Sequence, residues 1–139
     1  MKKGKSHYVL AICILAFSSF CFKNATNCSQ LRNGRFYYFA KKSRERIDVY
    51  RQDSLQLETS SKKDDVPLKN KIVWKSDCEY DMFINALSNS PLTGDDSIIA
   101  RTPANVKIIH IESSFYVCIA KLRVFDKDLE FRDTLFFTK

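Results

Sequence analysis

Histidine is scarce in this chain, and several residue arrangements that support metal or nucleophilic chemistry are missing. Only two of the 139 residues are histidine, and no two cysteines stand in a CxxC spacing. A metal site or a thiol nucleophile is therefore a weak interpretation. His110 has no G-x-S-x-G turn or triad spacing around it, so we expect a partnered or exposed side chain rather than a catalytic base. The sequence predicts no catalytic residue, no metal ligand and no cofactor.

An apolar run long enough for a membrane-spanning helix is also missing. The uncharged stretch from Tyr8 to Phe22 has fifteen residues, whereas a span needs about 20. Three lysines and no acid precede this stretch. A charged segment followed by a short apolar one is typical of a secretory signal peptide. We therefore expect export to the periplasm, the outer membrane or the medium.

The expected leader ends at Ser19-Phe20-Cys21. Small residues stand at the two positions that a signal peptidase reads, which predicts a signal peptide over 1–21 and a single β-rich domain over 22–139. Two alternatives stay open, a leader that remains as an N-terminal anchor and a lipoprotein with its lipid on Cys21. Phe20 stands where the bacterial lipobox has a small residue, which weighs against the lipid.

A strongly basic surface is lacking once the leader is removed. The whole chain carries +7, from 23 basic and 16 acidic residues. Three of the basic residues lie in the leader, which leaves 20 basic against 16 acidic residues and a net charge of +4. Asn33 to Phe39 resembles the aromatic strand of RNA-binding sheets, but it lacks that motif's second glycine or alanine. We predict no nucleic-acid partner.

Alternation of apolar and polar residues with a period of two dominates the rest of the chain. It predicts about eight antiparallel strands, at 35–40, 46–52 and 54–59, on either side of a corner at 76–78, and at 105–112, 115–124 and 129–138. Short turns favour a meander, so we predict a small or half-open lipocalin-like barrel, with a two-sheet β-sandwich as the alternative. We expect no helix in this part beyond a single turn at Asp95-Asp96.

Two longer loops interrupt the strands. The first, Ser60 to Lys69, is charged and contains a proline that a central strand would not tolerate. The second, Leu87 to Pro103, has seventeen residues, and loops of that length are often functional or mobile. If the barrel binds a ligand, this second loop is expected to be a flap over the cavity.

Three cysteines, Cys28, Cys78 and Cys118, remain after the leader. They allow one disulfide and one free thiol, and an exported protein sits where a disulfide persists. Cys28 and Cys78 stand at expected strand boundaries, whereas Cys118 lies inside an apolar strand pattern. Position therefore favours a bridge between Cys28 and Cys78, which the chain-entropy model values at roughly 4 kcal/mol.

The corner itself lies in Lys71 to Ile84, KIVWKSDCEYDMFI, which also holds the only tryptophan. Asp77, Glu79 and Asp81 alternate around Cys78 and would share one face of a strand. A calcium loop needs more oxygen ligands and a turn glycine, so a solvated strand face is the favoured interpretation.

Bulky apolar residues are expected to fill the barrel. The predicted interior comprises Phe36, Tyr38, Ile47, Val49, Trp74, Met82, Ile108, Val117 and Phe131. The register of the strands is left open by the pattern. Should a ligand cavity remain, its candidate lining is Phe36, Tyr38, Trp74, Met82, Val117 and Phe131.

Several motifs together resemble a family of small exported proteins from Bacteroidota-type bacteria. They are NCSQLRNGRFYYF, RQDSLQLET, IVWKSDCEYDMF and VKIIHIESSFYV. Shared features are a cysteine before an NGxFxY strand, a W-x-S/D-D-C-x-Y corner and a short β-rich tail. The resemblance implies export and the two-cysteine framework, and it implies no particular chemistry.

Three classes of function follow, in order of preference. The first is a non-enzymatic envelope or secreted protein that works through its surface, as an interaction or accessory module with another envelope protein as partner. The second is a lipocalin-like barrel that binds an apolar small molecule. An enzyme is third, because no catalytic constellation is found. Contact with a membrane is expected only through the leader or a lipid on Cys21. The volume left inside the barrel separates the first two classes.

Overall fold

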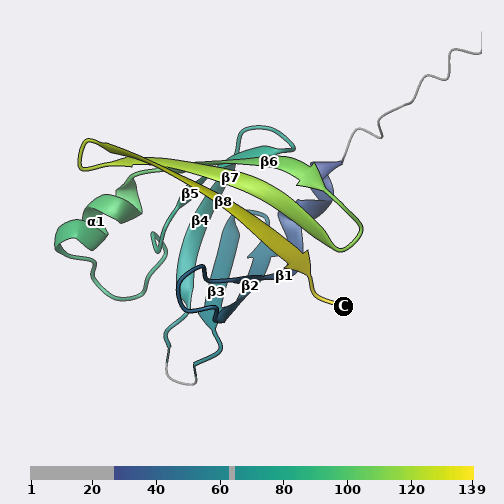
Figure 1. The fold of residues 1–139 in the computed structure, drawn as a ribbon. Helices are drawn as coiled ribbons and strands as arrows, with labels where there is room; N and C mark the ends of the chain where they lie inside the picture. Colours follow the sequence, from purple (N-terminus) through teal and green to yellow (C-terminus); the bar gives the residue numbers. More distant parts are fainter. Residues whose placement is uncertain (1–26, 63–64) are drawn as a thin grey trace, which may run out of the picture.

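Eight antiparallel strands form a closed barrel in sequence order, β1 to β8, with β8 returning to β1 (Figure 1). The computed structural model describes residues 27–62 and 65–139; the expected leader, with its cleavage site and Cys21, lies outside them. Because every strand pairs with its neighbour in the sequence, the predicted meander is confirmed and the sandwich is excluded. The strands are β1 (Asn33–Phe39), β2 (Arg46–Gln52), β3 (Leu55–Ser60), β4 (Leu68–Trp74), β5 (Glu79–Phe83), β6 (Ala104–Ile111), β7 (Phe115–Val124) and β8 (Lys127–Phe137).

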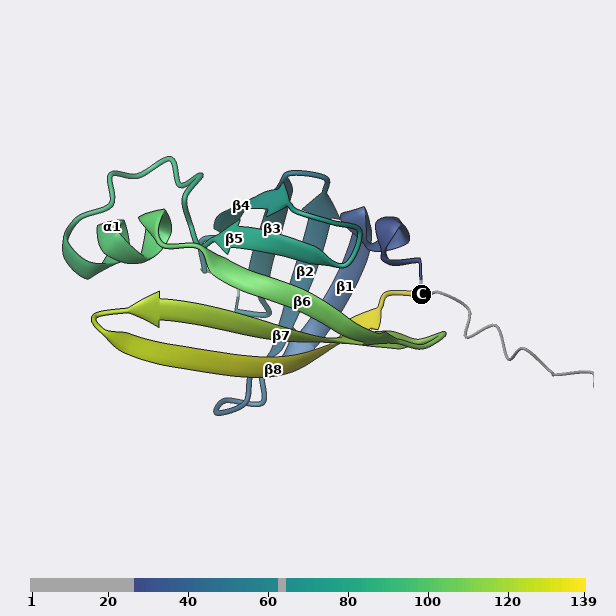
Figure 2. The same ribbon diagram turned by 90° about the horizontal axis from the view of Figure 1, so that it is seen from above.

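The two ends of the barrel differ. A 3-10 helix, η1 (Cys28–Arg32), covers one end, where Cys28 and Leu31 are buried. The short turns β2–β3, β4–β5 and β6–β7 lie at this closed end, and the longer connections β1–β2, β3–β4 and β5–β6 lie at the opposite, open end together with the β7–β8 turn (Figure 2). The main chain holds η1 in place, because Asp53 N donates to Arg32 O at 2.9 Å. Any interior space is therefore closed at one end only.

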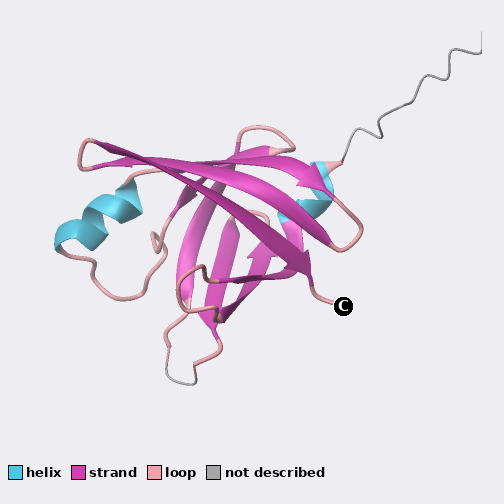
Figure 3. Ribbon diagram, in the orientation of Figure 1, coloured by secondary structure: helices cyan, strands magenta, loops and turns pink. Residues whose placement is uncertain are grey.

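A helix, α1 (Gly94–Arg101), stands at the open end, so the expectation of a single turn is wrong (Figure 3). Asp95 and Asp96 lie in its first turn, where acids favour a helix N-terminus. Ile99 packs against a small cluster of Ala104, Leu122 and Val124. This tertiary contact stabilises a helix that is too short for its sequence pattern to reveal. Across the described ranges, no helix has the length and apolar character of a membrane span.

The seam between β1 and β8 is the narrowest join in the barrel. Only two residue pairs, Phe36–Phe137 and Tyr37–Phe136, connect these strands, whereas ten pairs connect β7 and β8. Toward the open end β1 continues to Phe39 without a paired residue on β8. The seam is therefore paired near the closed end and unpaired toward the open end.

The strand β1 begins at Asn33, two residues before the expected start at residue 35. Gly34 has φ +152°, and a Cβ atom there would lie 2.9 Å from Cζ of Phe36. The absence of a side chain at Gly34 therefore lets the Phe36 ring lie over the backbone of its own strand.

Candidate ligand-binding cavity

A buried arginine lies at the base of the barrel interior. Arg51 follows Ile47 and Val49 in the inward phase of β2 and is only 1% exposed. Its guanidinium makes five hydrogen bonds to four partners, the Leu31 carbonyl, the Gln56 amide and two tyrosine hydroxyls. The predicted interior includes Ile47 and Val49 but not Arg51, although Arg51 continues their alternation along the strand.

Two tyrosines complete this base. The hydroxyls of Tyr80 and Tyr116 accept from Nη2 of Arg51 at 3.0 and 3.1 Å. Burial raises the pKa of Tyr80 to about 12, and burial likewise raises the pKa of Tyr116. Both hydroxyls therefore stay protonated at neutral pH and keep a hydrogen to donate. Trp74 packs against Tyr80 with ring centroids 4.6 Å apart, and its indole nitrogen donates to the Asp53 carbonyl.

The amide of Gln56 connects Arg51 to a carboxylate. Its oxygen accepts from Nε and Nη2 of Arg51 at 2.9 and 2.7 Å, and its nitrogen donates to Glu58 at 2.8 Å. Among the described residues no carboxylate forms a direct ion pair with Arg51. An uncompensated buried charge is strongly destabilising. The neutral amide of Gln56 connects the positive charge of Arg51 to the negative charge of Glu58, so that each compensates the other.

Glu58 is the centre of the polar wall. Besides the bond from Gln56, its carboxylate accepts from Nδ2 of Asn70 at 2.7 Å and from the Tyr38 hydroxyl at 2.9 Å. Burial raises the pKa of Tyr38, and the nearby carboxylates of Glu58 and Asp133 add to this effect. Asn70 also accepts from the backbone of Asn85 at 2.8 Å. The wall is thereby tied to the start of the long β5–β6 connection at the open end.

A cavity of about 280 Å³ lies above this network. One part of its lining is polar and belongs to the network just described or lies beside it. The other part is apolar and comes from β4 to β8. The polar residues are Tyr38, Arg51, Gln56, Glu58, Asn70, Tyr80, Cys118 and Asp133; the apolar ones are Leu68, Met82, Ile84, Ala104, Val106, Ala120, Leu122, Phe131 and Leu135. The interior thus combines apolar walls with a few fixed polar groups, as ligand sites do.

The structure places the six predicted lining residues in three different positions. Tyr38, Met82 and Phe131 line the cavity. Phe36 and Trp74 pack in the core cluster nearer the closed end. The prediction that Val117 faces inward is wrong. It lies between Tyr116 and Cys118 on the strand, and because these two neighbours face the interior, the side chain of Val117 points to the outer face. The strand β7 is apolar on both faces, so its sequence pattern did not fix which face turns inward.

The third cysteine, Cys118, is a free thiol on the cavity wall. Burial raises its pKa to about 12, and the Asp133 carboxylate contributes in the same direction. Asp133 lies beside it on β8 and forms an ion pair with Lys41 at 3.7 Å. Because Lys41 follows β1, this ion pair bridges the unpaired part of the seam.

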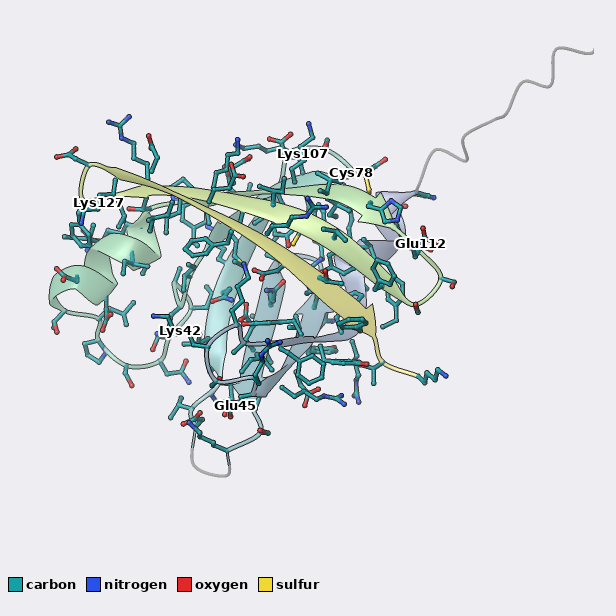
Figure 4. The ribbon with its side chains drawn as sticks, viewed as in Figure 1. Lys42, Glu45, Cys78, Lys107, Glu112 and Lys127 are labelled. Atoms are coloured by element: carbon teal, nitrogen blue, oxygen red, sulfur yellow. A yellow bond between two sulfur atoms is a disulfide. The ribbon has the colours of Figure 1, made fainter. Side chains whose placement is uncertain are left out.

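At the other end, Cys28 and Cys78 form the predicted disulfide, with their Cα atoms 5.1 Å apart. The bridge joins η1 to the β4–β5 corner, and Figure 4 shows Cys78 near the closed end and Lys42 near the open end. The acids around Cys78 pair with neighbouring side chains: Asp77 with Arg32 at 3.4 Å, and Asp81 with Lys75 at 2.9 Å. Within 27–62 and 65–139, no group of three or more His, Cys, Asp or Glu side chains is arranged to hold a metal ion.

A larger crevice, of about 630 Å³, lies outside the barrel between α1 and the strands β4 and β5. It is open to solvent, and its lining includes Lys71, Arg101 and three serines. The barrel cavity is the better candidate site, because its apolar walls and buried polar groups are held on rigid strands. Comparison of the chain with protein-family models, with curated proteins and with solved structures finds no match.

Proposed function

We propose that this barrel binds a small amphiphilic molecule, with its apolar part against the apolar lining residues of β4 to β8 and its polar part on the side of the cavity where Tyr38 and Asp133 lie. The observation that carries the proposal is the cavity of about 280 Å³, which remains although the interior strands carry bulky side chains. The volume is just below the range of ligand sites, which runs from about 300 to 1,000 Å³. It is nearly twice the roughly 150 Å³ cavity that admits benzene. The expected ligand therefore has on the order of ten non-hydrogen atoms.

Binding is proposed without catalysis, and in an exported protein. The oxygens of Glu58 already accept three hydrogen bonds, and the Cys118 thiol stays protonated at neutral pH because burial raises its pKa to about 12. Neither group is a ready base or nucleophile. The leader pattern supports export, and the Cys28–Cys78 disulfide is compatible with it.

An interaction module is the second candidate, and a row of aromatic side chains on the outer face of β1, β7 and β8 favours it. Tyr37 and Phe136 stack with ring centroids 5.3 Å apart, and Phe39 is half exposed beside them. Arg46 lies 4.1 Å from the Tyr37 ring centroid. A photo-crosslinking residue in place of Phe39 would capture one defined envelope protein, whereas the same residue in place of Glu130 would not.

Met82 allows a direct test of the cavity. It is the only methionine besides Met1, and its side chain lines the cavity. We expect hexan-1-ol to shift the ¹³C-methyl signal of Met82 in a saturable manner. Ala120→Phe, which fills the cavity, would abolish the shift. Ile119→Phe introduces the same ring on the outward face of the same strand and serves as the control. A Met82 signal in the wild-type protein that stays unchanged with hexan-1-ol and with six-carbon probes of other head groups would refute the proposal.

A further inference from the structure

The charges around the cavity are unequal. Two carboxylates, Glu58 and Asp133, and one guanidinium, Arg51, belong to its lining. The lining therefore carries a formal net charge of −1. Lys41 adds a positive charge at the rim, but its side chain is 63% exposed and it contacts Asp133 from outside the cavity.

The guanidinium of Arg51 is already occupied by protein groups. It donates to Gln56, to the Leu31 carbonyl and to the two tyrosine hydroxyls, at distances between 2.7 and 3.1 Å. It lies over the rings of Tyr80 and Phe36, with Cζ 5.0 and 5.3 Å from their centroids. An anionic ligand would therefore find no free cation at the base of the cavity.

The two carboxylates of the lining differ in how many protein groups already bind them. Glu58 accepts three hydrogen bonds from neutral donors. Asp133 has one partner for its carboxylate among the described residues, the Lys41 ammonium at 3.7 Å. Its side chain is 38% exposed, so the carboxylate lines the cavity and also reaches solvent. Asp133 thus has free acceptor capacity where the cavity meets the unpaired seam.

Aromatic rings flank this position. Tyr38 lines the cavity on the β1 side of the seam, and Phe131 lines it on the β8 side. The Tyr38 hydroxyl is held by Glu58 at 2.9 Å, which directs its proton away from the ligand. Ring faces next to carboxylates attract ammonium groups.

From this arrangement we infer that the molecule bound in the barrel carries a protonated amine, which pairs with Asp133 at the seam beside Tyr38. The apolar part then lies against Met82 and Ala120, and the amine takes the place of the Lys41 ammonium. The inference rests on the proposed function, because it names the chemical class of ligand for the same cavity. A charged amine needs a counter-charge when it leaves water, and Asp133 supplies it.

Three probes with one chain length and different head groups test this inference: hexan-1-amine, hexan-1-ol and hexanoate. Their dissociation constants would be measured by calorimetry at pH 7 and low salt, with the Met82 methyl signal reporting the site. We expect the amine to bind roughly tenfold more tightly than the alcohol and hexanoate to bind more weakly than the alcohol. In Asp133→Asn the amine should bind no more tightly than the alcohol does in the same variant. The matched control Asp128→Asn removes an exposed carboxylate from the same strand and would keep the advantage.

The outcomes separate the two proposals. Failure of all three probes to shift the Met82 signal would overturn the proposed function and this inference with it. Binding of the alcohol or hexanoate at least as tightly as the amine would leave the proposed function standing and overturn the inference. An amine preference that persists in Asp133→Asn would overturn the assignment to Asp133.

Discussion

Arg51 and Gln56 are joined by two hydrogen bonds inside the barrel, of 2.9 and 2.7 Å. This contact contributes to the stability of the fold and also sets the orientation of the polar groups that line the cavity. It holds Arg51 at the base, and it turns the amide nitrogen of Gln56 toward Glu58. The polar wall of the cavity is therefore oriented by a residue that does not need to touch a ligand.

Replacement of Arg51 tests this dependence. Arg51→Leu removes the charge that Gln56 relays to Glu58 and leaves two tyrosine hydroxyls without their donor, so we expect a loss of about 3–5 kcal/mol in the free energy of unfolding. Arg51→Lys should also destabilise, because an ammonium lacks the planar fork that reaches four partners. Urea titration followed by the fluorescence of Trp74 measures both. The exposed control Arg123→Leu should stay within about 0.5 kcal/mol, and an equally small effect of Arg51→Leu would contradict the assigned role.

The disulfide should account for a large share of the stability. Cys78→Ser opens the loop closed between residues 28 and 78, and we expect a loss of roughly 4 kcal/mol in the oxidised protein. Thermal unfolding with and without reductant measures this, because reduction should bring the wild-type protein down to the level of the variant. If Cys78→Ser melted at the same temperature as the oxidised wild-type protein, the bridge would contribute nothing to thermal stability.

Alkaline pH should destabilise the barrel. The pKa of Cys118 is raised by burial from 9.0 to about 12, and that of Tyr80 from 10.0 to about 12. The folded state therefore holds protons that the unfolded state releases, so the free energy of unfolding falls as pH rises above about 9. In Cys118→Ala the fall should begin nearer pH 10, where the tyrosines of the unfolded chain ionise. Urea titrations between pH 8 and 11 would show the difference, and identical profiles would argue against a buried protonated thiol.

The strands, their order and the disulfide could be predicted from the sequence because each leaves a local signal. Alternation marks a strand, short turns limit its partner to the next strand, and Cys28 and Cys78 stand at strand boundaries. Trp74 was correctly expected to pack in the core, where it lies against Tyr80. Such features depend on residues close together in the sequence.

The lining of the cavity could not be predicted in full, because residues from strands distant in the sequence come together there. Arg51 breaks the rule that charges face water, and its partners Tyr80 and Tyr116 come from distant strands. The face of β7 could not be chosen because both faces are apolar, and a register shift between Ile108 and His110 on the neighbouring strand complicates the phase further. The helix α1 is stabilised by contacts with Leu122 and Val124 rather than by its own pattern.

The two-pair seam also bears on how the chain folds. Phe36 and Phe137 lie 101 positions apart, while every other strand pair is formed by neighbours in the sequence. Joining such distant segments carries the largest loop-closure entropy and slows folding. We expect amide protons at the seam to exchange with solvent faster than those of β7, because few bonds must break to open it. The unpaired part of the seam, where Asp133 reaches solvent, would then be the part of the barrel that forms last during folding and opens first in the native state.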